Sequence, residues 1–262
     1  MNKIRFALKR FCLCLATAIM FAGCEKDPDI GVYEVTDEGW KTPELIRGAV
    51  TDVEGNVYDA VQIGSQVWMA QNLRTTQYAD GTSLYIYYAE SYVRFYTIEN
   101  PVDYGVLYNW KAVMRESSSS SSNPSGVQGI CPDGWHVPSD AEWTQLTDYV
   151  SSQSQYAFHG NNTQIAKALA ANVDWNESGN PGAIGNSLVS NNATGFSALP
   201  AGYHTFEYFG YEEMKNQACF WSATALDELD AYGRKLEYES PVVSDENIFS
   251  RATGLSVRCI RD

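Results

Sequence analysis

The sequence predicts an α+β domain in which strands come first, two helices follow in the middle, and antiparallel strands complete the chain. Short runs of β-branched and aromatic residues, divided by turn residues, occur before residue 75 and after residue 195. Between them, apolar residues recur at helical spacing in two segments. Strands and helices that are segregated along a chain in this way are typical of α+β domains.

The first strands are expected between residues 57 and 69. Residues 57–58 and 61–64 alternate in polarity after the turn sequence Glu-Gly-Asn at 54–56, and residues 66–69 have the composition of a paired strand. After the helices, four further runs are expected to form short antiparallel strands: 196–201, 219–224, 233–238 and 256–260.

The clearest helix begins after Ser139. Ser139 stands at the N-cap position and Glu142 follows three residues later, which is the pattern of a capping box. Three apolar residues then lie on one helical face: Trp143, Leu146 and Val150. A second, weaker helix is expected over about residues 163–171.

A serine-rich tract interrupts the domain at residues 116–126. It contains six consecutive serines, from Ser117 to Ser122, which bury no apolar surface. We expect it to be a mobile insertion within one domain that spans residues 46–262, rather than a boundary between two domains.

The N-terminal segment resembles a bacterial lipoprotein signal peptide. Four basic residues precede an apolar run from Phe11 to Ala22, and Ala22 and Gly23 lead directly into Cys24. The run is too short to span a bilayer, which takes about 20 apolar residues. The sequence therefore predicts a signal peptide at 1–23, lipidation at Cys24 and a flexible tether at 24–45. Glu-Lys-Asp at 25–27 resembles the acidic signals that direct Bacteroidetes lipoproteins to the outer face of the outer membrane.

Charge and cysteine content limit the partners and the compartment. Removal of residues 1–23 takes away four basic residues and no acidic one, so the net charge moves from −14 to −18. This charge argues against nucleic acid and against a basic membrane-binding face, which leaves the lipid anchor as the membrane contact. Three cysteines remain in the body of the domain, Cys131, Cys219 and Cys259. In an oxidising compartment, an odd number leaves one thiol free or paired outside the chain.

Seven ordered segments resemble a known family. They include Gly-Val-Leu-Tyr-Asn-Trp at 105–110, Cys-Pro-Asp-Gly-Trp-His-Val-Pro at 131–138 and Gly-Leu-Ser-Val-Arg-Cys-Ile-Arg-Asp at 254–262. The other segments are 55–58, 63–74, 195–202 and 220–224. In order and spacing they resemble the Fibrobacter succinogenes major paralogous domain, which occurs on exported lipoproteins. The resemblance covers nearly all of residues 46–262.

The resemblance implies a C-type lectin-like fold, loop-rich, with two helices and a final strand that returns beside the first. In such a fold a disulfide between Cys131 and Cys259 would join the ends of the domain, and Cys219 would be a buried thiol. Sequence alone leaves the connectivity open. The same resemblance extends to the formylglycine-generating enzyme, but that enzyme's pair of nearby cysteines has no counterpart here.

No catalytic set is found in the sequence, so an enzyme is not predicted. His136, His159 and His204 are isolated from one another and from any cysteine pair or nucleophile motif. His136, between Trp135 and Val137, is expected to be a packed structural residue. No cofactor is predicted. Oxygen ligands suited to a structural calcium ion cluster in one loop, although a polar loop explains them equally well: Asp174, Asn176, Glu177, Asn180 and Asn186.

Two aromatic clusters remain as candidate binding surfaces. One contains Tyr85, Tyr87, Tyr88, Tyr92, Phe95 and Tyr96, and the other, which we prefer because it lies in a loop, contains Tyr203, Phe206, Tyr208, Phe209 and Tyr211. Sugars stack on such rings. The sequence therefore predicts a lipid-anchored, non-catalytic cell-surface protein that binds an extracellular glycan or another extracellular ligand. The alternative is a structural or adhesive component of a surface protein assembly.

Overall fold

The structure is a computed structural model that describes residues 44–84, 95–97, 104–205 and 210–262. The predicted signal peptide, the lipidation site Cys24 and the tether up to residue 43 lie outside the described residues. Within the described ranges, no helix is long and apolar enough to cross a membrane.

The first sheet brings the beginning and the end of the domain together. Its five strands lie in the order β1-β2-β3-β12-β6, and each pairs antiparallel with its neighbour. The strands are β1 (Leu45–Thr51), β2 (Val57–Ile63), β3 (Gln66–Met69), β6 (Trp135–His136) and β12 (Ile260–Arg261). Ile260 stands opposite Trp68 on one side and His136 on the other, so the last strand is placed in the interior of the sheet.

The second sheet is built from the C-terminal third of the chain. Its order is β11-β10-β9, again antiparallel, with β9 (Gln217–Ala225), β10 (Asp230–Glu237) and β11 (Ser244–Ser250). Two small antiparallel pairs accompany it: β4 (Phe95–Thr97) with β5 (Val106–Tyr108), and β7 (Tyr203–Thr205) with β8 (Gly210–Glu212).

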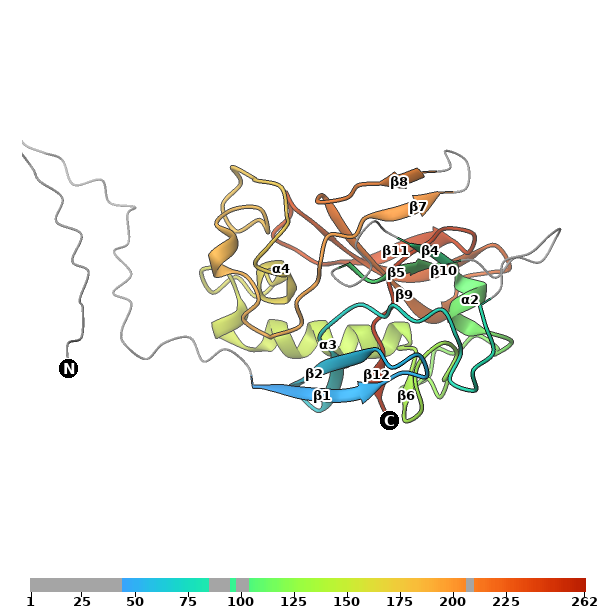
Figure 1. The fold of residues 1–262 in the computed structure, drawn as a ribbon. Coiled ribbons are helices and arrows are strands. Elements are labelled where there is room, and N and C mark those ends of the chain that lie inside the picture. Colours follow the sequence, from blue (N-terminus) through green and yellow to red (C-terminus); the bar gives the residue numbers. More distant parts are fainter. Residues whose placement is uncertain (1–43, 85–94, 98–103, 206–209) are drawn as a thin grey trace, which may run out of the picture. The chain divides into compact units, whose positions relative to one another are not determined.

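Helix α3 (Asp140–Ser152) lies between the two larger sheets (Figure 1). The expected capping box starts it: Ser139 Oγ accepts from the Glu142 amide, and the Ser139 amide donates to Glu142 Oε2 at 2.9 Å. The other helical elements are short: α2 (Trp110–Met114), α4 (Ala166–Leu169) and 3-10 turns at Ser154–Tyr156 and Leu188–Ser190.

Four large rings form the centre of the core around α3. Trp143 of α3 packs 4.6 Å from Trp68 of β3, 5.8 Å from Phe196 and 5.6 Å from Phe220 of β9, measured between ring centroids. All four side chains are buried. Burying one such ring stabilises the fold by about 1.5–3 kcal/mol, so this contact fixes α3 between the sheets.

A disulfide joins Cys131, just before β6, to Cys259, just before β12. It is the pair that the family resemblance favours, and it closes a loop with a sequence separation of 128. Cys219 is a free, buried thiol on β9, and burial raises its pKa.

The structure has few helices and several antiparallel sheets, so it is a mixed fold, as the α+β prediction expects.

Some predicted elements differ from the structure. The predicted strand at 196–201 is wrong: only Ala198 makes a bridge, to Ala170, and Ser197 has a positive φ of 56°. The Arg258 guanidinium donates hydrogen bonds to the carbonyls of Phe196 and Ser197. These two carbonyls are therefore bonded to a side chain and not to a neighbouring strand. The second helix is shorter than predicted, and the final strand is limited to Ile260–Arg261. The sequence analysis also did not predict seven of the strands: β1, β4, β5, β6, β7, β8 and β11.

The serine tract, expected to be mobile, is hydrogen-bonded to the end of β9. The Ser120 amide donates to the Ala223 carbonyl at 3.0 Å, and the Ser120 carbonyl accepts from Thr224 Oγ1 at 2.7 Å. The Ala225 amide donates to Ser119 Oγ at 2.8 Å. Hydrogen bonds from hydroxyl and backbone groups therefore hold this run of serines against β9, although serines bury no apolar side chain. The prediction of mobility rested on composition and did not consider such bonds.

Candidate functional site

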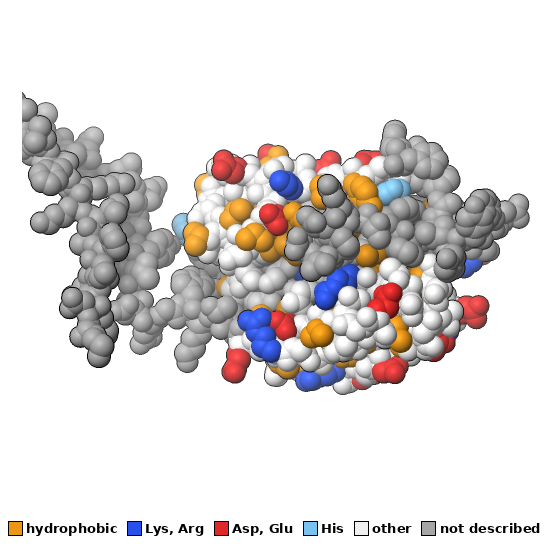
Figure 2. Space-filling model, viewed as in Figure 1, with side chains coloured by type: hydrophobic (Ala, Val, Ile, Leu, Met, Phe, Trp, Pro, Cys, Tyr) orange, Lys and Arg blue, Asp and Glu red, His pale blue; other side chains and the backbone are white. Residues whose placement is uncertain are grey.

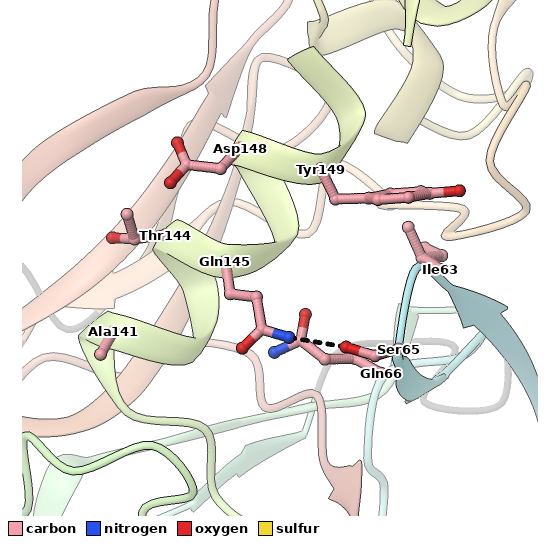
Figure 3. A pocket seen from close by; sticks show the side chains of 8 residues that line it. All are labelled: Ile63, Ser65, Gln66, Ala141, Thr144, Gln145, Asp148 and Tyr149. Carbon is pink, nitrogen blue, oxygen red and sulfur yellow. Dashed lines mark hydrogen bonds between the residues drawn. The ribbon is translucent and has the colours of Figure 1, made fainter. Parts of the chain in front are cut away.

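A groove of about 470 Å³ lies between α3 and the turn that joins β2 to β3 (Figure 3). We call it the α3 groove and define it by the residues that line it: Ile63, Ser65, Gln66, Ala141, Thr144, Gln145, Asp148 and Tyr149. The helical residues come from successive turns of one face of α3, because residues three and four apart in a helix are neighbours. The opposite wall is the β2–β3 turn.

The aromatic wall of the α3 groove depends on Gly64. This glycine has a φ of +62°, and a Cβ built on it would stand 2.9 Å from the Cγ and Cδ2 atoms of Tyr149. The absence of a side chain therefore lets the Tyr149 ring lie against the turn, and the ring remains 36% exposed beside the groove. The result is a ring that is supported on one side and accessible from the other.

Polar groups lie next to that ring. Gln145 Nε2 donates to Ser65 Oγ at 2.9 Å, and Gln145 Oε1 accepts from Asn123 Nδ2 at 2.6 Å, so both ends of this amide are oriented. Gln66 is fixed more deeply, since its Nε2 donates to the Glu142 carbonyl at 3.0 Å. The groove therefore offers amide and hydroxyl groups in defined positions, together with the exposed carboxylate of Asp148.

A buried arginine supports the helical wall from behind. Arg234 of β10 pairs with Asp140 Oδ1 at 2.5 Å and donates to Thr144 Oγ1 at 2.9 Å. Its side chain is almost completely buried, whereas Asp140 is partly exposed. Because these contacts hold the first turns of α3 to the second sheet, they also fix one end of the groove.

Of the predicted ligand-binding aromatics, the structure describes Tyr203 on β7 and Tyr211 on β8. Tyr203 stands opposite Glu212, and His204 stands opposite Tyr211. Adjacent residues of a strand point to opposite faces, so Tyr203 and Tyr211 lie on different faces of the hairpin. Phe206, Tyr208 and Phe209 lie outside the described residues, as do Tyr85, Tyr87, Tyr88 and Tyr92 of the other cluster.

The two faces of the hairpin have different surroundings. The Tyr203 hydroxyl donates to Glu212 Oε2 at 3.3 Å, and its ring packs on the core. Burial and the neighbouring Glu212 raise the pKa of Tyr203 to about 12. Tyr211 is 40% exposed and packs edge-on against His204 with ring centroids 5.3 Å apart. Of the two tyrosines, Tyr211 is the one that can offer a ring to a ligand.

Three of the residues considered as calcium ligands donate hydrogen bonds through their side-chain amide nitrogens. Asn176 Nδ2 donates to Asn216 Oδ1 at 2.7 Å, Asn180 Nδ2 to the Glu239 carbonyl at 2.9 Å, and Asn186 Nδ2 to the Ser178 carbonyl at 3.2 Å. Across the part of the chain that the structure describes, no group of three or more His, Cys, Asp or Glu residues is arranged to hold a metal ion.

His136 is buried between two carboxylates, a cluster that the sequence analysis missed. Its Nε2 lies 2.7 Å from Glu142 Oε1, and its Nδ1 lies 2.6 Å from Asp262 Oδ1. Burial alone lowers the pKa of His136, but the two carboxylates outweigh it and the pKa is raised. When the ring is protonated, each of its two nitrogens can donate to one of these carboxylates. The sequence signal that could have indicated this cluster was the short spacing of six residues between His136 and the capping-box residue Glu142.

Among the described residues that Figure 2 shows, charges of both signs are interspersed.

Comparisons with known proteins place most of the domain in one family. The sequence model of the family described as the Fibrobacter succinogenes major domain matches residues 61–261. No curated protein matches the chain, and no solved structure matches it.

Proposed function

The chain belongs to the Fibrobacter succinogenes major domain family, and from this premise we propose that it is a lipid-anchored cell-surface protein that binds glycan without catalysis. We place the binding site in the α3 groove and regard the fold as C-type lectin-like. The N-terminal signal ending at Cys24 supports the anchor, and the acidic residues after it support display on the outer face of the outer membrane.

The observation that carries the proposal is the Tyr149 ring supported by Gly64 beside oriented polar groups. Sugar rings present C–H faces that pack on an aromatic ring, while their hydroxyls need donors and acceptors at the edge. Gln145, one helical turn from Tyr149, and Ser65 of the facing turn supply such groups, and Thr144 and Asp148 line the other side of the groove. A few fixed polar groups around an apolar contact surface are the usual composition of a small-ligand site.

The lining of the groove favours binding over hydrolysis. Glycoside hydrolysis uses two carboxyl groups that flank the scissile bond. Among the residues that line the α3 groove, Asp148 alone carries a carboxylate, and nearby Asp140 is paired with Arg234. His136 has both ring nitrogens engaged with carboxylates.

The glycan proposal is tested with residues 25–262 on glycan arrays and in polysaccharide affinity gels. We expect the variant Tyr149→Ala to lose retention and the matched variant Tyr211→Ala to keep it, because both remove a partly exposed tyrosine but only one ring lines the groove. Retention lost in Tyr211→Ala alone would move the site to the β7–β8 hairpin. Silence across plant, host and microbial polysaccharides would refute glycan binding.

The anchor and the location are tested separately. Metabolic palmitate labelling of the full chain is expected to mark the wild type and not Cys24→Ala. Protease treatment of intact cells is expected to remove the domain if it faces outward, and protection of the domain would place it on the inner face.

A second candidate function is a structural or adhesive subunit of a surface assembly. Exposed apolar side chains at one end of the second sheet favour it: Leu226, Leu229 and Ile248. Ile248 lies on β11, which is an edge strand. A stoichiometric protein partner that co-purifies with the wild type but not with Ile248→Lys, combined with no sugar affinity, would favour this candidate.

A further inference from the structure

The ammonium group of Lys167 is surrounded by backbone carbonyls. Lys167 lies on α4 and is 7% exposed. Its Nζ lies 3.2 Å from the Ala183 oxygen, 3.5 Å from the Ile184 oxygen and 3.3 Å from the Ser187 oxygen, and it also donates to the Asn186 carbonyl. Four carbonyls of one five-residue turn therefore converge on a single positive charge.

This charge has no carboxylate partner among the described residues, whose ion pairs do not include Lys167. Buried lysines are normally paired with an acid, because an uncompensated charge is costly to remove from water. Burial accordingly lowers the pKa of Lys167 to about 8. The compensation that the structure provides consists of carbonyl dipoles alone.

The turn that supplies the carbonyls is held in place from outside. The Gly185 amide donates to the Tyr238 carbonyl at 2.8 Å, and the Gly185 carbonyl accepts from the Ser178 amide at 3.1 Å. A Cβ on Gly185 would stand 2.2 Å from the Asn176 carbonyl oxygen, so only glycine allows this close approach. The carbonyls therefore point at Lys167 from a backbone that other contacts already constrain.

Carbonyl oxygens that converge from an irregular turn are also how proteins hold a bare cation. We propose that the turn at residues 183–187 is a cation-binding site whose occupant is the chain's own Lys167 ammonium. When the Lys167 side chain is shortened, the site is expected to bind a small ammonium ion from solution. The proposal concerns the loop-rich half of the domain and is independent of glycan binding at the α3 groove.

The test compares Lys167→Ala with Lys111→Ala, which removes an exposed lysine from α2. In sodium buffer we expect the melting temperature to fall by about 5–10 °C for Lys167→Ala and to stay unchanged for Lys111→Ala. Replacing sodium with ammonium or methylammonium at equal ionic strength is expected to restore part of the loss in Lys167→Ala only. Tetramethylammonium, which has no N–H donor, is expected to restore nothing.

An unchanged melting temperature in Lys167→Ala, or an equal response to all four cations, would overturn the proposal. A readout on the wild-type protein covers the case in which the variant does not fold. Reductive methylation of the native chain, followed by mass spectrometry, is expected to modify Lys167 at least about tenfold more slowly than Lys111. Equal rates at the two lysines would show an accessible amine and would refute the internal site.

Discussion

The ring of Tyr149 rests on the backbone of Gly64, where an added Cβ would meet two ring carbons at 2.9 Å. We therefore expect Gly64→Ala to displace the ring from the wall of the α3 groove. The backbone strain at φ +62° is expected to lower the free energy of unfolding by about 1–3 kcal/mol as well. Urea unfolding measures the strain, and glycan affinity gels measure the effect on the groove.

Gly55→Ala is the control for that change. Gly55 also has a positive φ, of +84°, but a Cβ added there would have no neighbouring atom within 4 Å. It is expected to lose similar stability and to keep full ligand retention. Equal retention of the ligand by Gly64→Ala and Gly55→Ala would show that the position of the Tyr149 ring does not affect ligand binding.

The two carboxylates around His136 predict a pH dependence of stability. Because Glu142 and Asp262 raise the pKa of folded His136 above its ordinary value of 6.5, the folded state binds the proton more tightly than the unfolded state. The stabilisation is fully present below pH 6.5 and is lost as the pH rises through the raised pKa. We expect the free energy of unfolding to fall over this window.

Urea unfolding at a series of pH values from about 6 to 9, with NMR titration of the His136 ring, measures this effect. His136→Gln keeps a polar side chain without a titrating group and is expected to lack the fall. Lys167, with its pKa lowered to about 8, contributes an opposite trend to both proteins, so the His136→Gln profile is subtracted from the wild-type profile. A difference that rises over the same range would contradict the ion-paired assignment.

The three cysteines of the domain predict distinct behaviours. Removing the disulfide with Cys131→Ala and Cys259→Ala is expected to lower the free energy of unfolding by about 4–5 kcal/mol, because the closed loop is long.

Iodoacetamide is expected to leave native residues 25–262 unmodified and to alkylate Cys219 alone after unfolding without reductant, since that thiol is buried and free. Alkylation of Cys219 in the native protein would show that β9 is less well packed than the structure indicates.

Local signals in the sequence were sufficient for the elements whose causes are local. The Ser139–Glu142 capping box and the stripe of Trp143, Leu146 and Val150 predicted α3, and both are present. The strand predicted at 196–201 failed because its carbonyls bind Arg258, which is some 60 residues away in the sequence. Strand β11 has a mostly polar sequence, and it forms because β10 offers it an edge.

The α3 groove was outside the reach of sequence patterns for the same reason. Its walls come from residues 63–66 and 141–149, which no local period relates to each other. Of the predicted aromatic cluster at 203–211, the two described tyrosines, Tyr203 and Tyr211, lie on different faces of the hairpin because of strand alternation. Nearness in sequence therefore did not place these two rings on a common face.

Lys167 and Arg258 are buried cations that donate to several backbone carbonyls. Arg258 Nε donates to Asn72 Oδ1 at 2.7 Å, and its guanidinium donates to the carbonyls of Met69 and Ser197 at 2.9 and 2.7 Å. It also lies over the ring of Phe196, 4.7 Å from the centroid. Among the described residues, both buried cations are compensated by dipoles, and neither takes part in an ion pair with a carboxylate.

Arg258→Lys is therefore expected to be severely destabilising although it conserves the charge. A lysine has one nitrogen in place of the planar fork, so it leaves buried carbonyls without donors and loses the stacking on Phe196. We expect the free energy of unfolding to fall by about 3–5 kcal/mol in urea. The same substitution at Arg47, whose side chain is 76% exposed in its ion pair with Asp59, is expected to change it by less than about 1 kcal/mol. Equal small losses at the two positions would mean that charge alone, and not the geometry of the guanidinium, holds residues 196–197 in place.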